Sequence, residues 1–108
     1  LRKWFGIFKY KDGGIYKGDW VNGEMEGKGK YEYENGDNYD GEWKNGVVHG
    51  KGKYVYENGD FYDGEYDNDQ RVGYGIFQYK DGSKYEGNWK DNKFHGKGKY
   101  TYSDTQDI

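Results

Sequence analysis

Residues 39–56 read YDGEWKNGVVHGKGKYVY, and this stretch decides the fold because its pattern recurs every 23 residues. The opening motif, Tyr-x-Gly-x-Trp, begins at residues 16, 39, 62 and 85, with Tyr66 in place of the tryptophan in the third copy. A motif of alternating glycine and lysine or aromatic residues follows each time. A fixed period of roughly 20–50 residues is typical of repeat architectures. The sequence therefore predicts an array of repeats.

Each half of the repeat alternates between two faces, which is typical of β-strands. Tyr39, Gly41 and Trp43 share one face, and charged residues occupy the other. Asn-Gly and Asp-Gly pairs, which favour tight hairpin turns, separate the strands at residues 22–23, 35–36, 45–46, 58–59 and 81–82. The pattern predicts an all-β fold, an elongated single-layer antiparallel sheet of stacked β-hairpins with about nine strands.

The repeats account for nearly the whole chain, so we expect one domain over residues 1–108. A partial repeat at residues 4–15 precedes full repeats at 16–38, 39–61, 62–84 and 85–107. The chain begins at Leu1 without a methionine, so we expect a fragment or a processed piece.

The composition is unusual for a folded protein. Leu, Ile, Val and Phe supply only 15 of 108 residues, a fraction that is typical of disorder when the net charge is also high. Here 17 basic residues nearly balance 20 acidic ones, so the net charge is low. The 14 Tyr and 4 Trp can form a core in place of Leu and Ile. The absence of cysteine excludes disulfides and thiolate zinc sites. No apolar run approaches the ~20 residues of a membrane span.

The glycines of the repeat are expected to be structural slots in which aromatic rings lie, because a ring laid over a strand glycine restores lost contact. A turn at residues 45–46 would place Trp43 opposite Gly50, and the next turn would place Tyr54 opposite Gly64. The predicted structural glycines are Gly18, Gly27, Gly29, Gly41, Gly50, Gly52, Gly64, Gly73, Gly75, Gly87, Gly96 and Gly98.

The opposite face is expected to balance its own charge. The same register places Lys51 opposite Glu42 and Lys53 opposite Asp40, and such pairs contribute about 0.2–1 kcal/mol each. Lysines and rings thus lie on opposite faces and the net charge is −3, so we expect no nucleic-acid partner.

The unit Tyr-x-Gly-x-Trp-x-x-Gly-x-x-x-Gly-x-Gly, complete at residues 39–52, resembles the MORN repeat family. The resemblance covers residues 4–105 and departs from the family at Tyr66, Asp69, Asn92 and Thr105. It implies a shallow groove lined by the repeat aromatics. It also implies an intracellular scaffold, in the cytoplasm, in a cytoskeletal, ciliary or axonemal assembly, or associated with a membrane.

The predicted function is a non-catalytic scaffold for protein–protein interaction. A partner, either an amphipathic helix or an extended segment, would lie on the aromatic face, because an exposed apolar patch typically marks an interaction site. The predicted groove residues are Trp20, Tyr31, Tyr33, Trp43, Tyr54, Tyr56, Tyr66, Phe77, Tyr79, Trp89, Tyr100 and Tyr102. A loop ridge of Met25, Val48 and Phe94 either extends this groove or packs on the adjacent tryptophans.

No catalytic, cofactor or metal site is expected. Residues 46–52 lack the spacing and the Ser or Thr of a phosphate loop, and residues 67–72 lack the glycine of a calcium loop. Open edge strands near residues 6–10 and 96–102 favour self-association. Two alternatives remain: a membrane-proximal module that binds phosphoinositides, and a regulatory or targeting segment of a larger enzyme.

Overall fold

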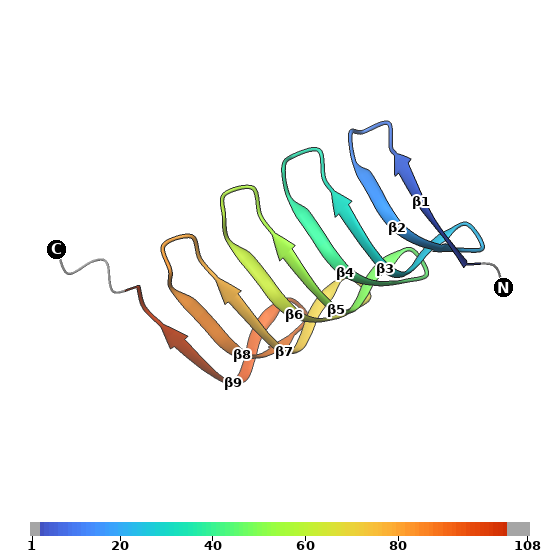
Figure 1. The fold of residues 1–108 in the computed structure, drawn as a ribbon. Helices are drawn as coiled ribbons and strands as arrows, with labels where there is room; N and C mark the ends of the chain where they lie inside the picture. The colour runs from blue at the N-terminus through green and yellow to red at the C-terminus, as the bar shows by residue number, and fades with distance from the viewer. Residues whose placement is uncertain (1–2, 104–108) are drawn as a thin grey trace.

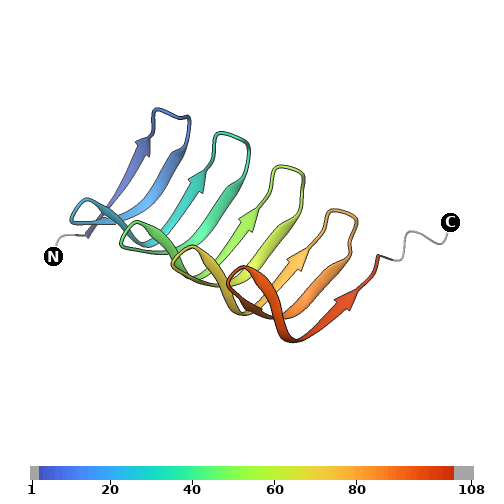
Figure 2. The ribbon, with the colours of Figure 1, turned by 180° about the vertical axis from the view of Figure 1, so that it is seen from behind.

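The computed structural model describes residues 3–103 as one antiparallel sheet whose nine strands follow each other in sequence order (Figures 1 and 2). The predicted all-β array of hairpins is confirmed. The edge strands are β1 and β9, as predicted, and self-association through them stays a prediction. The strands are β1 (Lys3–Lys9), β2 (Ile15–Val21), β3 (Glu24–Glu32), β4 (Asn38–Lys44), β5 (Val47–Val55), β6 (Phe61–Asp67), β7 (Gln70–Gln78), β8 (Lys84–Lys90) and β9 (Lys93–Thr101).

Two-residue turns connect the strands within each repeat. Both residues of each turn have positive φ, for example 52° at Asn45 and 83° at Gly46, which is the type I′ geometry that suits the twist of a hairpin. Asp69 and Asn92 occupy the second turn position at φ 70° and 68° in place of glycine. Asn and Asp tolerate this left-handed conformation better than other side chains do.

Five-residue turns connect one repeat to the next. An Asn or Asp side chain closes each turn, as where Asn35 Oδ1 accepts the Asp37 N–H at 2.9 Å. Successive long turns are also bonded to each other. These bonds run from the Glu57 N–H to Asp37 (2.8 Å), from the Lys80 N–H to Asp60 (2.8 Å) and from the Ser103 N–H to Ser83 (3.2 Å).

A β-bulge in each short hairpin corrects the predicted register. Trp43 pairs with Val48, and Gly50 pairs instead with Tyr66 on the next strand, so the expected pairing of Trp43 with Gly50 is wrong. Gly50 has a φ of 82°, and the equivalent Gly27, Gly73 and Gly96 are also left-handed. Extra residues on one strand bend it and shift its pairing. The short hairpins accordingly turn out of the plane of the sheet (Figures 1 and 2).

The bulge also shifts the charged face. Lys53 lies opposite Asp40, as predicted, but Lys51 pairs with Glu65 rather than with Glu42. Tyr54 lies opposite Tyr62 and not Gly64 for another reason: the long turn between β5 and β6 has five residues and not two. Opposite charges face each other across β3 to β6, as expected, but Lys17 pairs with Lys30 between β2 and β3.

The tyrosine that begins each opening motif is buried: Tyr16, Tyr39 and Tyr62 have no exposed surface, and Tyr85 is 7% exposed. Each ring lies over a pair of glycines that face each other across two strands, such as Gly41 and Gly52. The Tyr39 hydroxyl donates to the backbone carbonyl of Glu42 at 3.0 Å. The predicted slots are confirmed for these glycine pairs. They are wrong for Gly50 and its three equivalents, which turn the backbone.

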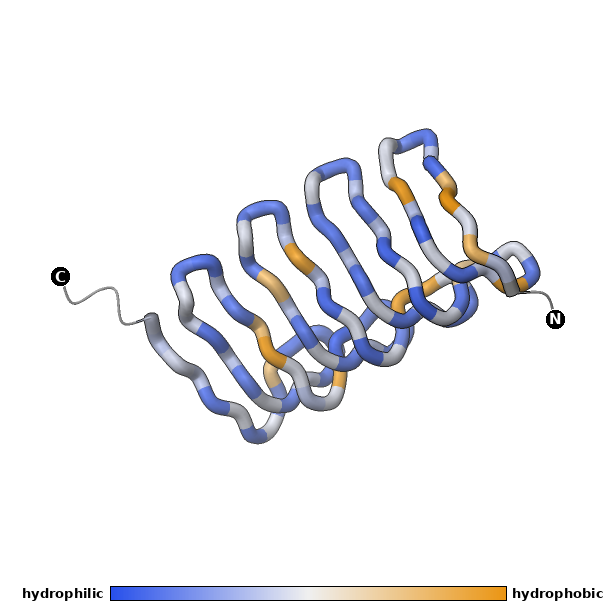
Figure 3. The backbone as a smooth tube through the Cα atoms, viewed as in Figure 1, coloured by the Kyte–Doolittle hydropathy of each residue, from blue (hydrophilic) through white to orange (hydrophobic). Residues whose placement is uncertain are grey.

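Tryptophans complete this inner layer. The Trp43 indole N–H donates to the Gly29 carbonyl at 3.0 Å, and its ring packs edge-on against Tyr16 and Tyr39 at centroid distances of 5.3 Å. Tyrosine, tryptophan and glycine have intermediate hydropathy, so the backbone of this well-packed array shows only scattered hydrophobic stretches (Figure 3).

Candidate functional site

An outer row of aromatic rings runs along the array above the inner layer. Neighbouring ring centroids are 4.5–6.3 Å apart along the entire row. The rings of this row lie near the ends of the odd-numbered strands, β1 to β9, and on the first residue after each of these strands. The outer row consists of Phe8, Tyr10, Tyr31, Tyr33, Tyr54, Tyr56, Phe77, Tyr79, Tyr100 and Tyr102.

The predicted groove residues divide between the two layers. Trp20, Trp43, Tyr66 and Trp89 are only 5–8% exposed and belong to the core, contrary to the expectation that these rings stay accessible. The other eight lie in the outer row, where they range from half-buried to fully exposed. A partner on this face would therefore contact tyrosines and Phe77, with the tryptophans beneath them.

The loop ridge packs mainly on the inner layer. Met25 pairs with Trp20, and Val48, which is buried, pairs with Trp43. Phe94 stacks on Tyr85 at 4.1 Å but keeps half of its surface exposed. The packing alternative is thus confirmed for Met25 and Val48, whereas Phe94 contributes to the surface.

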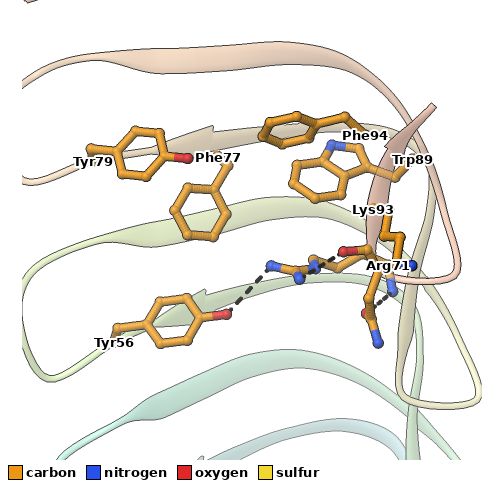
Figure 4. A pocket seen from close by; sticks show the side chains of 8 residues that line it. Tyr56, Arg71, Phe77, Tyr79, Trp89, Lys93 and Phe94 are labelled. Carbon is orange, nitrogen blue, oxygen red and sulfur yellow. Dashed lines mark hydrogen bonds between the residues drawn. The ribbon is translucent and has the colours of Figure 1, made fainter. Parts of the chain in front are cut away.

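Two adjoining hollows form a groove beside the outer row. The larger, of about 570 Å³, extends from Tyr56 to Phe94 (Figure 4), and the smaller, of about 400 Å³, extends from Tyr33 to Arg71. Tyr56, Arg71 and Asn92 line both hollows. Ligand sites typically occupy about 300–1,000 Å³ and combine apolar walls with a few polar groups, as this groove does.

Tyr33 and Tyr54 of the groove are neutral hydrogen-bonding groups at physiological pH. Burial, with smaller contributions from Tyr31 and Asp69, raises the pKa of Tyr33 to about 12. Burial and a 2.7 Å hydrogen bond to Asp37 raise the pKa of Tyr54 further above its ordinary value. The Tyr33 hydroxyl can therefore donate to a partner without adding charge, whereas the Tyr54 hydroxyl already donates to Asp37.

Arg71 and Asn92 are the groove residues that sequence reasoning missed. Arg71 occupies the loop-ridge position of the third repeat, because it follows Val48 and precedes Phe94 by one 23-residue period, and it pairs with Tyr66 as they pair with tryptophans. The period itself therefore identifies this position, and Arg71 was missed because it is charged where the other three residues are apolar. Asn92 appeared only as a departure from glycine, yet its side chain accepts the Arg71 N–H at 2.8 Å.

Residues 3–103 hold no group of three or more His, Cys, Asp or Glu side chains arranged to bind a metal ion. Over the same range the chain forms no helix that could cross a membrane.

The model of the MORN repeat matches the chain at residues 16–38, 39–61, 62–84 and 85–105. The first three matches have the predicted boundaries, and the fourth ends two residues before the predicted end. A comparison with curated proteins finds no match.

Proposed function

Because the chain belongs to the MORN repeat family, we propose that it is a non-catalytic scaffold that holds a segment of a partner protein in the aromatic groove. MORN repeats are in general modules for interaction with proteins or membranes. The cytoskeletal or ciliary setting that the family suggests is part of this proposal, and the location of the tagged full-length protein in cells tests it.

The observation that carries the proposal is the continuity of the outer row with the two hollows. Half-buried rings such as Tyr56, Phe77 and Tyr79 line the larger hollow and keep part of their surface accessible. Aromatic side chains contribute much of the energy at protein interfaces because they bury a large area with little loss of rotamer freedom. An elongated groove of this kind suits a helix or an extended segment.

A lipid headgroup is supported less well. Lysines of the opposite face lie across from carboxylates, as Lys30 and Lys53 do from Asp40, and Lys28 lies 3.8 Å from Glu42. Recognition of an anionic membrane typically needs a cluster of basic residues near the surface. Here the acidic partners neutralise much of that charge, which leaves the aromatic face as the preferred site.

A peptide-display selection against the purified array tests the proposal. Selected peptides are synthesised, and their affinity is measured by calorimetry for the wild type, for the double variant Tyr56→Ala/Tyr79→Ala and for Tyr74→Ala. Tyr74 is half-exposed on the charged face and serves as the matched control. We expect at least a tenfold loss for the groove variant and no loss for the control. Equal affinity for all three proteins would refute the groove as the site.

A further inference from the structure

The third repeat differs from the others where a short hairpin contacts the groove. In three repeats a tryptophan pairs with an apolar residue across the bulge, but in the third Tyr66 pairs with Arg71. Both members of the pair are changed together, and the smaller ring of Tyr66 leaves room for a longer side chain. The four pairs are Trp20 with Met25, Trp43 with Val48, Tyr66 with Arg71 and Trp89 with Phe94.

Arg71 is held in a fixed orientation (Figure 4). Its backbone N–H donates to Asn92 Oδ1 at 2.8 Å, and its Nη2 donates to the Asn92 carbonyl at 3.0 Å. Its Nη1 donates to the Tyr56 hydroxyl at 3.4 Å. A guanidinium group has five N–H donors, so these two contacts leave donors for a ligand. The orientation is set before any partner arrives, which reduces the entropy lost on binding.

Three aromatic rings lie close to the guanidinium group. Its central carbon lies 4.8 Å from the centroid of Trp89 and 5.7 Å from those of Phe77 and Tyr62. These contacts favour the charged group without neutralising it. They also exclude water from one side, so an ionic hydrogen bond formed here is stronger than one in bulk solvent.

The larger hollow is cationic although the chain as a whole is acidic. Its lining includes Arg71 and Lys93 and no Asp or Glu. Within residues 3–103, no carboxylate lies within ion-pair distance of Arg71. Asp69, in the smaller hollow, accepts the Val48 N–H at 2.9 Å. The hollow therefore offers two positive charges, beside Phe77 and Phe94, to whatever enters it.

We propose that Arg71 binds an Asp or Glu carboxylate of the partner segment, while an apolar side chain next to that residue packs on Phe77 and Phe94. The proposal rests on the proposed function and specifies the chemistry of the partner. Guanidinium and carboxylate form paired, charge-assisted hydrogen bonds that set geometry as well as affinity. The partner is thus an acidic and apolar segment.

The test uses peptides selected on the wild-type array, each made again with its acidic residues changed to the amides. Calorimetry compares both forms on the wild type and on Arg71→Met, which has the residue of the first repeat at this position. On the wild type we expect the amide form to bind roughly tenfold to a hundredfold more weakly. On Arg71→Met most of this difference should be lost, because only Lys93 then remains as a cation in the hollow, and Arg71→Lys should restore part of the difference.

Circular dichroism of Arg71→Met first establishes that the variant remains folded. Selected peptides without acidic residues, or acid and amide forms of equal affinity on the wild type, would overturn this proposal but not the proposed function. If no peptide is selected, or if Tyr56→Ala/Tyr79→Ala binds like the wild type, both fail. Sedimentation with phosphatidylinositol bisphosphate vesicles, if it depends on Arg71, would assign the hollow to a phosphate headgroup and also overturn the proposal.

Discussion

The substitution Gly52→Ala tests the packing of the core most directly. A Cβ at Gly52 would lie less than 3.0 Å from the phenol group of Tyr39. That ring has no exposed surface, and it lies between Trp43 at 5.3 Å and Tyr66 at 5.5 Å. It cannot move aside without displacing a neighbour, so the array must expand around the added methyl group.

The expected cost has two parts. Overpacking of a close-packed core costs about 1–3 kcal/mol. A shifted ring also loses the 3.0 Å hydrogen bond from its hydroxyl to the Glu42 carbonyl, which adds about 0.5–1.5 kcal/mol. We therefore expect the free energy of unfolding to fall by about 3 kcal/mol, and Tm to fall by about 12–24 °C in a chain of this size. Urea unfolding followed by tryptophan fluorescence measures the change.

Two further variants make the result specific. Gly46→Asn is the control, because Gly46 has open space around it and Asn92 already occupies the equivalent turn position. Its stability should stay within about 0.5 kcal/mol of the wild type. In the double variant Gly52→Ala/Tyr39→Phe the atom nearest to the new methyl group is gone, so the two costs should not add. If the unfolding costs of the two substitutions add, or if Gly52→Ala is as stable as the wild type, the idea that Tyr39 fits tightly against Gly52 is refuted.

Three further predictions follow from the core, the pKa shifts and the turns. Trp43→Ala should cost about 3–5 kcal/mol in unfolding free energy, whereas Tyr74→Ala on the charged face should cost less than 0.5, as chemical denaturation will show. Burial raises the pKa of Tyr16 and Tyr62 to about 12, so the contribution of these two groups to stability should be constant below pH 10 and should fall between pH 10 and 12, by up to about 1.4 kcal/mol per pH unit for each group; titration of both groups near pH 10 in the folded protein would contradict this. Asp37→Ala removes an acceptor for a backbone N–H and a hydroxyl of the next repeat, and should cost about 1–3 kcal/mol, measured by thermal unfolding.

The strands and turns could be predicted because their signals are local. Alternation within five to nine residues indicates a strand, and Asn45-Gly46 specifies a type I′ turn by its own conformational preference. The 23-residue period then fixes the order of the strands, since each one pairs with its neighbours in sequence.

The register could not be predicted from the turn alone. Gly50 fits a ring slot and a left-handed bulge equally well by sequence, because glycine is permitted in both. The structure settles the choice through the Glu42 side chain, which accepts the Lys51 N–H at 3.1 Å beside the bulge. The same contact recurs one period earlier, where Asp19 accepts the Lys28 N–H at 3.2 Å, but an acidic residue at this position does not by itself show which N–H it accepts.

The sequence predicted only part of the candidate site. The alternation of aromatic residues located the face, but it did not separate the inner layer from the outer row. That separation depends on the bend at each bulge, which folds the short hairpin back over Trp43 and its equivalents. Arg71 was missed for a different reason: the 23-residue period places it at the position of Met25, Val48 and Phe94, but the ridge was selected for apolar residues.

The bonds between successive long turns have a consequence for how such a protein can change in length. Deletion of residues 39–61 would join two repeats at the same point of the unit, and Asp37 would then accept the Lys80 N–H that Asp60 accepts now. Asp37, Asp60 and Ser83 form the same bond at three junctions, so a repeat can be lost there without a new kind of contact between the long turns. Each unit adds two strands, or about 10 Å. Repeat number thus acts as a molecular ruler, and the distance spanned along the groove is adjustable in steps of one unit.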